Sequence, residues 1–162
     1  MKTSCLVLVL LGAVHAAEPE VTVKQVSFKQ LKEAVAAHKG KVVVIDMWGT
    51  FCVPCKEEFH NLVEIHKQHE KAGVVCMSVA LDPSTSKDAL AFLKSKKAAF
   101  QNFLLDEDNT KDLCENFQFG AVPAVFVFDK QGKRHDFTLE DPRKQFTYKD
   151  VKAFVARLVA KP

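Results

Sequence analysis

Residues 48–58, which read WGTFCVPCKEE, decide the fold of this chain. They follow residues 42–47 (VVVIDM), a mostly apolar run rich in β-branched side chains that predicts a strand buried on both faces. A long helix, with apolar side chains at helical spacing, is predicted after Pro54 and ends at Gly73. The two cysteines of the segment therefore stand where a buried strand turns into a helix.

The spacing of these cysteines favours a reactive pair. Cys52 is expected at the helix N-terminus, where unpaired backbone N–H groups and the helix dipole stabilise a nucleophilic thiolate. Cys55 lies one turn further on, so a disulfide can close locally. A purely structural disulfide remains an alternative. A zinc site is another alternative, but His66 and His69 lie roughly 16–20 Å away along the helix, too far to share a metal with the cysteines.

The rest of the chain alternates strands with helices. Strands are predicted at residues 21–26, 74–81, 103–106, 125–129 and 133–137, and helices at 27–38, 89–97, 109–117 and 148–158. Strands separated by helices imply parallel crossover connections, whereas the turn at residues 130–132 closes an antiparallel hairpin. We therefore expect an α/β domain with one mixed sheet and helices on both faces.

Residues 1–16 have the three-part pattern of a secretory signal peptide. Lys2 precedes an uncharged apolar run over residues 5–14, and Val14 and Ala16 are small residues at the two positions that a signal peptidase reads, which suits cleavage after Ala16. The run is shorter than the roughly 20 residues that span a bilayer. We expect residues 17–162 to form one domain that is periplasmic or secreted, without a transmembrane anchor.

The composition excludes several classes of protein. The chain is 48% hydrophobic and 27% charged, which is typical of a globular domain. Its 23 basic and 20 acidic residues leave a net charge of +3, so no nucleic-acid partner is expected. Five cysteines are too few for a disulfide scaffold: Cys5 would leave with the signal peptide, and Cys76 and Cys114 are expected to be free core residues. A Cys76–Cys114 disulfide is the alternative.

A late proline supports the redox interpretation. Pro123, in the sequence AVPA at residues 121–124, comes directly before a predicted buried strand. Because proline is excluded from central strands, Pro123 should stand at the start of the strand, in a special turn. We expect a cis peptide bond there, with an ordinary trans bond as the alternative.

Together these features resemble the TlpA/ResA-like (DsbE/CcmG-like) group of extracytoplasmic thiol–disulfide oxidoreductases, which have a thioredoxin-like fold. The resemblance rests on residues 48–58, on Val122-Pro123 and on the inserted helix–strand segment at 83–106. It implies that Cys52 is the attacking thiol and Cys55 the resolving thiol, the two forming a redox-active disulfide. It also implies that Pro123 is cis and faces the pair.

The resemblance further implies which residues bind substrate and which move protons. Substrate contacts are expected from Trp48, Val53, Pro54 and the backbone of Val122. Glu58 matches a carboxylate that this group uses, and Asp46 matches the buried aspartate of plain thioredoxins. A carboxyl buried under the site has a raised pKa and can accept the proton of the resolving thiol. The alternatives are that Glu58 is a solvated first-turn acid and that Asp46 is a strand-end residue capping backbone groups, and the sequence does not assign the proton to either.

Two positions depart from the pattern of the group. His60 stands where proline is common, so the active-site helix should lack a kink there. Phe51 stands where tryptophan is more usual, which is a conservative change.

The implied function is thiol–disulfide exchange on protein disulfides, in the reducing direction. Expected partners are protein substrates such as apocytochrome c and a membrane thiol donor, and the protein is expected to be a monomer. No cofactor and no metal are needed. Alternatives are a disulfide oxidase or isomerase using the same cysteines, a non-catalytic binding module, and a peroxidase of the peroxiredoxin kind. That last class has a threonine three residues before its reactive cysteine, where this chain has Gly49.

Overall fold

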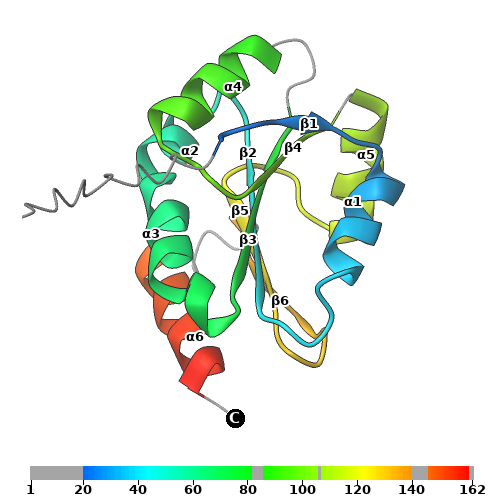
Figure 1. Ribbon diagram of the computed structural model, residues 1–162. Coiled ribbons are helices and arrows are strands. Elements are labelled where there is room, and N and C mark those ends of the chain that lie inside the picture. Colours follow the sequence, from blue (N-terminus) through cyan, green and yellow to red (C-terminus); the bar gives the residue numbers. More distant parts are fainter. Residues whose placement is uncertain (1–19, 82–85, 106, 140–145, 161–162) are drawn as a thin grey trace, which may run out of the picture.

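The central sheet is built around β2 (Val43–Trp48), the strand that leads to the cysteines. The computed structural model describes residues 20–81, 86–105, 107–139 and 146–160 (Figure 1). The predicted signal peptide and Pro83 and Asp106, the ends of the predicted insertion, lie outside these residues. Strands in the order β1-β4-β3-β2-β5-β6 form one sheet. The other strands are β1 (Lys24–Gln25), β3 (Val75–Ala80), β4 (Gln101–Leu104), β5 (Ala124–Phe128) and β6 (Arg134–Phe137).

The pairing of the strands confirms the predicted mixed sheet. β2 runs parallel to β3, and β3 and β1 run parallel to β4, whereas β5 is antiparallel to both β2 and β6. The predicted hairpin turn joins β5 to β6, and Gly132 adopts a positive φ of 81° within it. The predicted first strand is shortened to two residues, because β1 lies at the edge and pairs only with the short β4.

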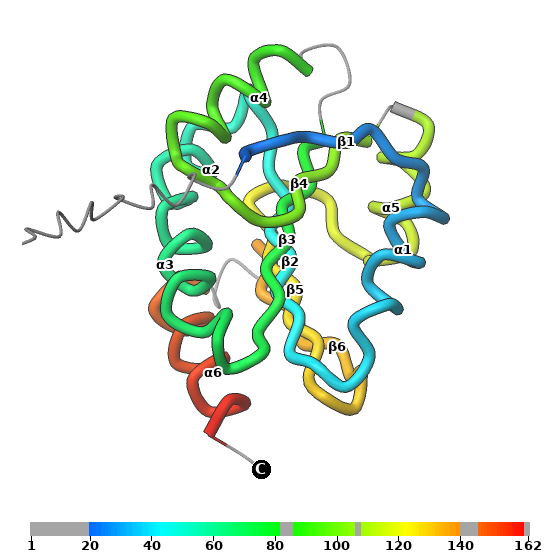
Figure 2. The backbone as a smooth tube through the Cα atoms, viewed as in Figure 1, coloured from blue at the N-terminus to red at the C-terminus, as the bar shows by residue number. Residues whose placement is uncertain are grey.

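Helices cover both faces of the sheet (Figures 1 and 2). α1 (Phe28–Ala36) and α5 (Glu107–Phe117) lie on one face. The other face carries α2 (Val53–Glu58), α3 (His60–His69), α4 (Ser86–Ser95) and α6 (Tyr148–Ala160). A short 3-10 turn, η1 (Glu70–Ala72), ends at the predicted Gly73. None of the described helices is long and apolar enough to cross a membrane.

The alternation of side chains along β2 divides the core into two clusters. Val43, Ile45 and Met47 pack with α1 and α5, whereas Val44 and Trp48 pack with α2, α3, α4 and α6. All six residues of β2 are buried, as the apolar run predicts. We name the two sides the α1/α5 face and the α2/α6 face. The disulfide cysteines belong to the α2/α6 face.

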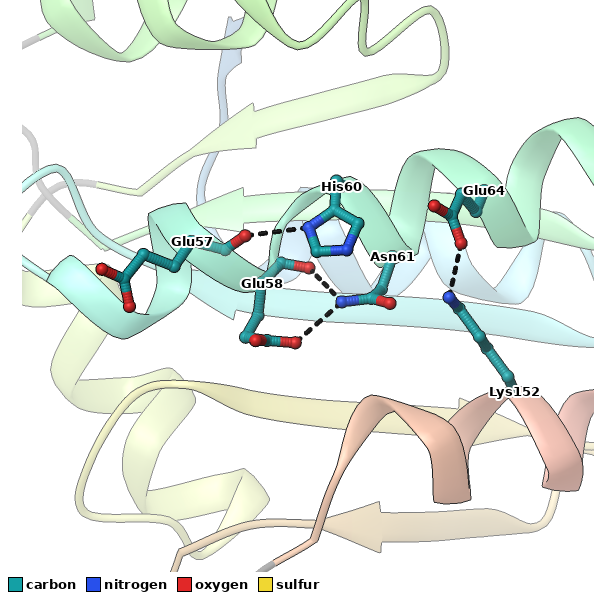
Figure 3. A network of polar contacts seen from close by, with 6 residues as sticks. All are labelled: Glu57, Glu58, His60, Asn61, Glu64 and Lys152. Atoms are coloured by element: carbon teal, nitrogen blue, oxygen red, sulfur yellow. Dashed lines mark hydrogen bonds and ion pairs between the residues drawn. The ribbon is translucent and has the colours of Figure 1, made fainter.

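The predicted long helix after Pro54 is interrupted at Phe59, so the expectation of an unkinked helix at His60 is wrong (Figure 3). Side chains bind the carbonyl groups around the break. His60 Nδ1 lies 2.9 Å from the carbonyl oxygen of Glu57, and Asn61 Nδ2 donates to the carbonyl oxygen of Glu58 at 2.8 Å. The Leu62 N–H donates to Phe59, three residues back, as in a 3-10 turn. Local polar side chains therefore interrupt the helix without proline.

Candidate active site

The two cysteines form a disulfide at the start of α2. Cys52 is the N-cap residue, Cys55 lies in the first turn, and their sulfur atoms are 2.03 Å apart. The Cys55 N–H donates to Cys52 Sγ at 3.3 Å, so the sulfur takes the place that a capping oxygen usually occupies. Pro54 stands in the first turn, as predicted. The helix N-terminus thus directs an N–H group at the sulfur that is predicted to attack.

The loop before β5 lies against this disulfide. The Val122–Pro123 peptide bond is cis, as the resemblance implies, and β5 begins at the next residue. The carbonyl oxygen of Val122 lies 3.7 Å from Cys52 Sγ, although the two residues are 70 positions apart. The fold therefore brings together the two motifs that were singled out in the sequence.

Apolar side chains surround the disulfide, but not all of those predicted to contact substrate are accessible. Phe51 is 67% exposed and Val53 58% exposed, and Pro54 is exposed as well. Trp48 is fully buried, with its ring 4.8 Å from that of Phe92. Because the side chain is buried, its position does not match the prediction of a direct substrate contact. The exposed surface is supplied by the neighbours of the cysteines.

Asp46 is the buried acid of the site. It lies in the middle of β2, only 1% exposed, and the alternation of the strand directs it to the α2/α6 face. The hydroxyl of Tyr148 donates a hydrogen bond to Oδ2, and Oδ1 has no hydrogen-bond partner among the described residues. Desolvation raises the pKa of Asp46 from 3.8 to about 7, and the Tyr148 hydrogen bond lowers it in part. The carboxyl can therefore exchange a proton near neutral pH.

Glu58 occupies a different environment. It is exposed at the end of α2, and its carboxylate accepts a hydrogen bond from Asn61 Nδ2 at 2.8 Å (Figure 3). It lines a cavity of about 240 Å³ together with Pro123, Leu139, Phe146, Thr147 and Tyr148. We name this hollow the proline cavity. Of the two predicted acids, Asp46 is buried and Glu58 is exposed.

Tyr148 is the site residue that the sequence analysis missed. It is buried at the start of α6, and it contacts Asp46 as well as lining the proline cavity. Burial, and then the charge of Asp46, raise the pKa of its phenol well above the ordinary value. One signal was available: it is the only tyrosine in the chain, next to the Thr147–Asp150 helix cap. An aromatic residue in the first turn of a helix is nevertheless typical of a core position.

The remaining cysteines take no part in the site. Cys76 is buried on β3 and Cys114 is partly exposed on α5, and both are free. Cys76 packs on the α2/α6 face and Cys114 on the α1/α5 face, so the sheet separates them and the alternative disulfide is excluded. Among the described residues, no group of three or more histidine, cysteine or acidic side chains could hold a metal ion.

A cysteine pair that begins a helix beside a cis-proline, on a mixed sheet of this strand order, defines the chain as a thioredoxin-like protein with a Cys-X-X-Cys centre. Comparison with known families then makes the assignment specific. Residues 14–134 match the AhpC/TSA family, and the chain belongs to that family.

Individual proteins show the same likeness. The chain is 32% identical to the thiol-disulfide oxidoreductase ResA of Bacillus subtilis (strain 168) over 96 residues, which are 59% of this chain and 51% of the relative. It thus spans about half the length of the curated relatives it matches.

Solved structures bear out the fold. The thioredoxin domain of a thiol-disulfide oxidoreductase from Bacteroides vulgatus superposes with a TM-score of 0.62 at 23% identity, covering 75% of this chain and 84% of that one. A secreted thiol-disulfide isomerase from Corynebacterium glutamicum gives a TM-score of 0.66 at 22% identity, covering 78% and 75%. At these identities the likeness establishes the fold alone.

Proposed function

We propose that the protein is a thiol–disulfide oxidoreductase that reduces disulfides of other proteins outside the cytoplasm. The observation that carries the proposal is the Cys52–Cys55 disulfide at the N-terminus of α2, with Cys52 Sγ 3.7 Å from the Val122 carbonyl oxygen. The names of the relatives support the chemistry. The pattern of residues 1–16 supports the compartment, and so does the description of one structural neighbour as secreted.

The proposed reaction has two exchange steps. In the reduced protein, the Cys52 thiolate attacks a substrate disulfide, which forms a mixed disulfide and releases one substrate thiolate. Cys55 then loses its proton to Asp46 and attacks Cys52 Sγ, which releases the second substrate thiolate. The substrate gains two electrons, the Cys52–Cys55 disulfide forms, and solvent protonates the released thiolates.

The surface around Cys52 suits a protein substrate. Phe51 and Val53 flank it with exposed apolar side chains, and the Val122 backbone lies beside the sulfur. We propose that an extended substrate segment lies along the loop before Pro123. We propose apocytochrome c as one such substrate. A membrane thiol donor would return the Cys52–Cys55 disulfide to the reduced state.

A trapping experiment tests this function. Replacing Cys55 with serine leaves Cys52 free to attack but removes the resolving thiol, so mixed disulfides with substrate proteins should accumulate and disappear on reduction. Cys114→Ser is the matched control, since it removes a free cysteine away from the site and should trap nothing. The proposal fails if the Cys55→Ser protein captures no extracytoplasmic protein and the wild type reduces no protein disulfide.

The direction of transfer is decided by the reduction potential of the pair. We expect a value near that of thioredoxin, about −270 mV, which favours reduction of substrates. A value near about −120 mV, as in a strong oxidant, would instead favour the oxidase.

Turnover of hydrogen peroxide separates the oxidoreductase from a peroxidase of the peroxiredoxin kind. The position that carries a threonine hydroxyl in that class is Gly49, over which the Phe51 ring lies so closely that an added Cβ would come within 2.5 Å of it. We therefore expect disulfide reduction to be much faster than peroxide reduction by the same protein.

A further inference from the structure

The contact between Tyr148 and Asp46 joins the last helix of the chain to its central strand. The two residues are 102 positions apart, both are buried, and the tyrosine hydroxyl donates to Oδ2 of the carboxyl group. The other oxygen, Oδ1, has no hydrogen-bond partner within the described part of the chain. A buried acceptor without a partner is unfavourable, because it has lost its hydrogen bonds to water. The Asp46 carboxyl group therefore has a hydrogen-bond donor at Oδ2 and none at Oδ1 among the described residues.

Contacts of the two preceding residues, Phe146 and Thr147, hold Tyr148 in position. Thr147 caps α6: its Oγ1 accepts from the Asp150 N–H at 3.4 Å, and its own N–H donates to the Asp150 carboxylate at 2.8 Å. The ring of Phe146 packs against the tyrosine ring with centroids 6.1 Å apart. The phenol therefore has a fixed position at the first turn of the helix.

Tyr148 also separates Asp46 from the proline cavity. The tyrosine lines the cavity, together with Glu58 and Pro123, whereas Asp46 does not. Through its hydroxyl the tyrosine contacts the carboxyl on its other side. It is the link between the buried acid and the hollow beside the cis-proline.

Few other ionisable groups face Asp46. Burial, and then the charge of Asp46, raise the pKa of Cys76 on β3. Cys55 of α2 belongs to the same apolar cluster as Cys76 and Tyr148. The charge of Glu58 reaches Tyr148. Lys152, one turn further along α6, forms an ion pair with Glu64 of α3 at 2.5 Å (Figure 3). Among the described residues, Tyr148 is the group that stabilises the ionised carboxylate against desolvation.

We propose that Tyr148 is a positioning residue for the thiol chemistry, which holds Oδ2 of Asp46 and leaves Oδ1 to receive the proton of Cys55. The inference rests on the proposed function above. In the resolving step, the Cys55 S–H proton passes to Oδ1 while the Cys55 sulfur attacks Cys52 Sγ. The electron pair of the broken sulfur–sulfur bond leaves with the substrate thiolate.

The test measures the pH dependence of the resolving step. Reduced protein carrying Cys114→Ser is mixed with one equivalent of dithionitrobenzoate, so that Cys52 releases the first aromatic thiol and Cys55 the second. In Tyr148→Phe the carboxyl loses its donor, so the pH midpoint of the second release should rise by about one unit. The rate should fall up to about tenfold at pH 7 and recover at higher pH. Phe154→Leu, which alters the packing of α6 against the Phe137 ring and removes no contact of Tyr148, should leave the midpoint unchanged.

A second variant covers the case in which Tyr148→Phe fails to fold. Because the chain has a single tyrosine, growth with 3-fluorotyrosine modifies this position alone. The more acidic phenol donates more strongly, so the midpoint should move to lower pH, opposite to the shift in Tyr148→Phe. A merely structural role does not produce opposite shifts.

The outcomes separate this inference from the proposed function. Coincident midpoints in the wild type, Tyr148→Phe and the fluorinated protein would overturn the role of Tyr148 while leaving the exchange chemistry intact. A wild type that releases no second aromatic thiol would overturn the exchange chemistry. In that event, carboxyl NMR titration of Asp46 still decides the role of Tyr148: a shifted midpoint in the variants supports it and an unchanged midpoint refutes it.

Discussion

Asp46 makes the stability of the protein depend on pH. Its pKa is raised from 3.8 to about 7 in the folded protein, chiefly by desolvation. Between these two values the folded protein binds more protons than the unfolded chain, so the free energy of unfolding falls as pH rises. Below pH 4 the carboxyl is protonated in both states and the penalty disappears. Above pH 7 it is ionised in both, and the penalty is complete.

Replacing Asp46 with asparagine should remove this dependence. The side chain keeps an acceptor for Tyr148 but cannot ionise, so the variant should be more stable than the wild type at pH 8, by up to roughly 4 kcal/mol. The difference should vanish near pH 4. Urea unfolding of the oxidised proteins at several pH values measures this. Asp108→Asn, which alters an exposed acid on α5, is the control and should follow the wild type. Parallel curves for Asp46→Asn and the wild type would contradict the raised pKa.

At the scale of single residues, the sequence predicts those site residues that a local spacing marks. Cys52 and Cys55 are close in sequence, and Pro123 is marked by the strand that it precedes, so a pattern can find them. The partnership of Tyr148 with Asp46 is fixed only when α6 packs on the sheet, and no local pattern specifies it. The burial of Trp48 has the same origin, because α4 supplies the Phe92 ring that packs on it.

Among the elements, the active-site helix is divided at Phe59 by polar side chains, which the apolar spacing of the helix does not predict. The helical spacing of Phe59, Leu62 and Val63 correctly predicts that these side chains are buried. The break depends on His60 and Asn61, whose polar groups lie near the carbonyl oxygens of the preceding turn. Helix periodicity does not predict such contacts between polar side chains and backbone carbonyl groups, because it describes only where apolar residues recur.

Asn61 should therefore stabilise the junction of α2 and α3. It is 6% exposed and donates to both the carbonyl oxygen and the carboxylate of Glu58. Asn61→Ala should lower the free energy of unfolding by about 1–3 kcal/mol, because two part-buried hydrogen bonds, one of them to a carboxylate, are lost. Asn116 makes a similar bond to the Asp112 carbonyl oxygen from an exposed position on α5. Its replacement by alanine should cost less than about 0.5 kcal/mol, and equal losses in the two variants would refute this account.

Across the whole molecule, the sheet separates a face that carries the buried ionisable side chains and the disulfide from a face packed with aliphatic and aromatic side chains. Asp46, Tyr148, Cys76 and the disulfide lie on the α2/α6 face. The α1/α5 cluster is formed by aliphatic and aromatic side chains such as Phe28, Leu113 and Phe126. The alternating and continuous apolar patterns predicted this layered arrangement well. They placed every strand of the described sheet within a few residues, apart from the shortened β1, because burial on one or two faces is what such patterns record.

The separation predicts how the two free thiols behave. In oxidised protein that lacks residues 1–16, Cys114 should react with a maleimide in the native state, since it is partly exposed. Cys76 should react only after unfolding, because it is 1% exposed and burial raises the pKa of its thiol. Mass spectrometry after labelling, with Cys114→Ser and Cys76→Ser proteins to assign the sites, measures this. A peptide pair linked through Cys76 and Cys114 would contradict the structure.

The hydrogen bond from Tyr148 to Asp46 also bears on the order in which the protein becomes competent during synthesis. The ribosome completes the cysteines, the acid and the cis-proline loop well before it reaches α6. A nascent chain that has not yet released its last helix therefore carries the reactive groups without the residue that holds the buried carboxyl. On the role proposed for Tyr148, the docking of α6 on the sheet is then the event that completes the site.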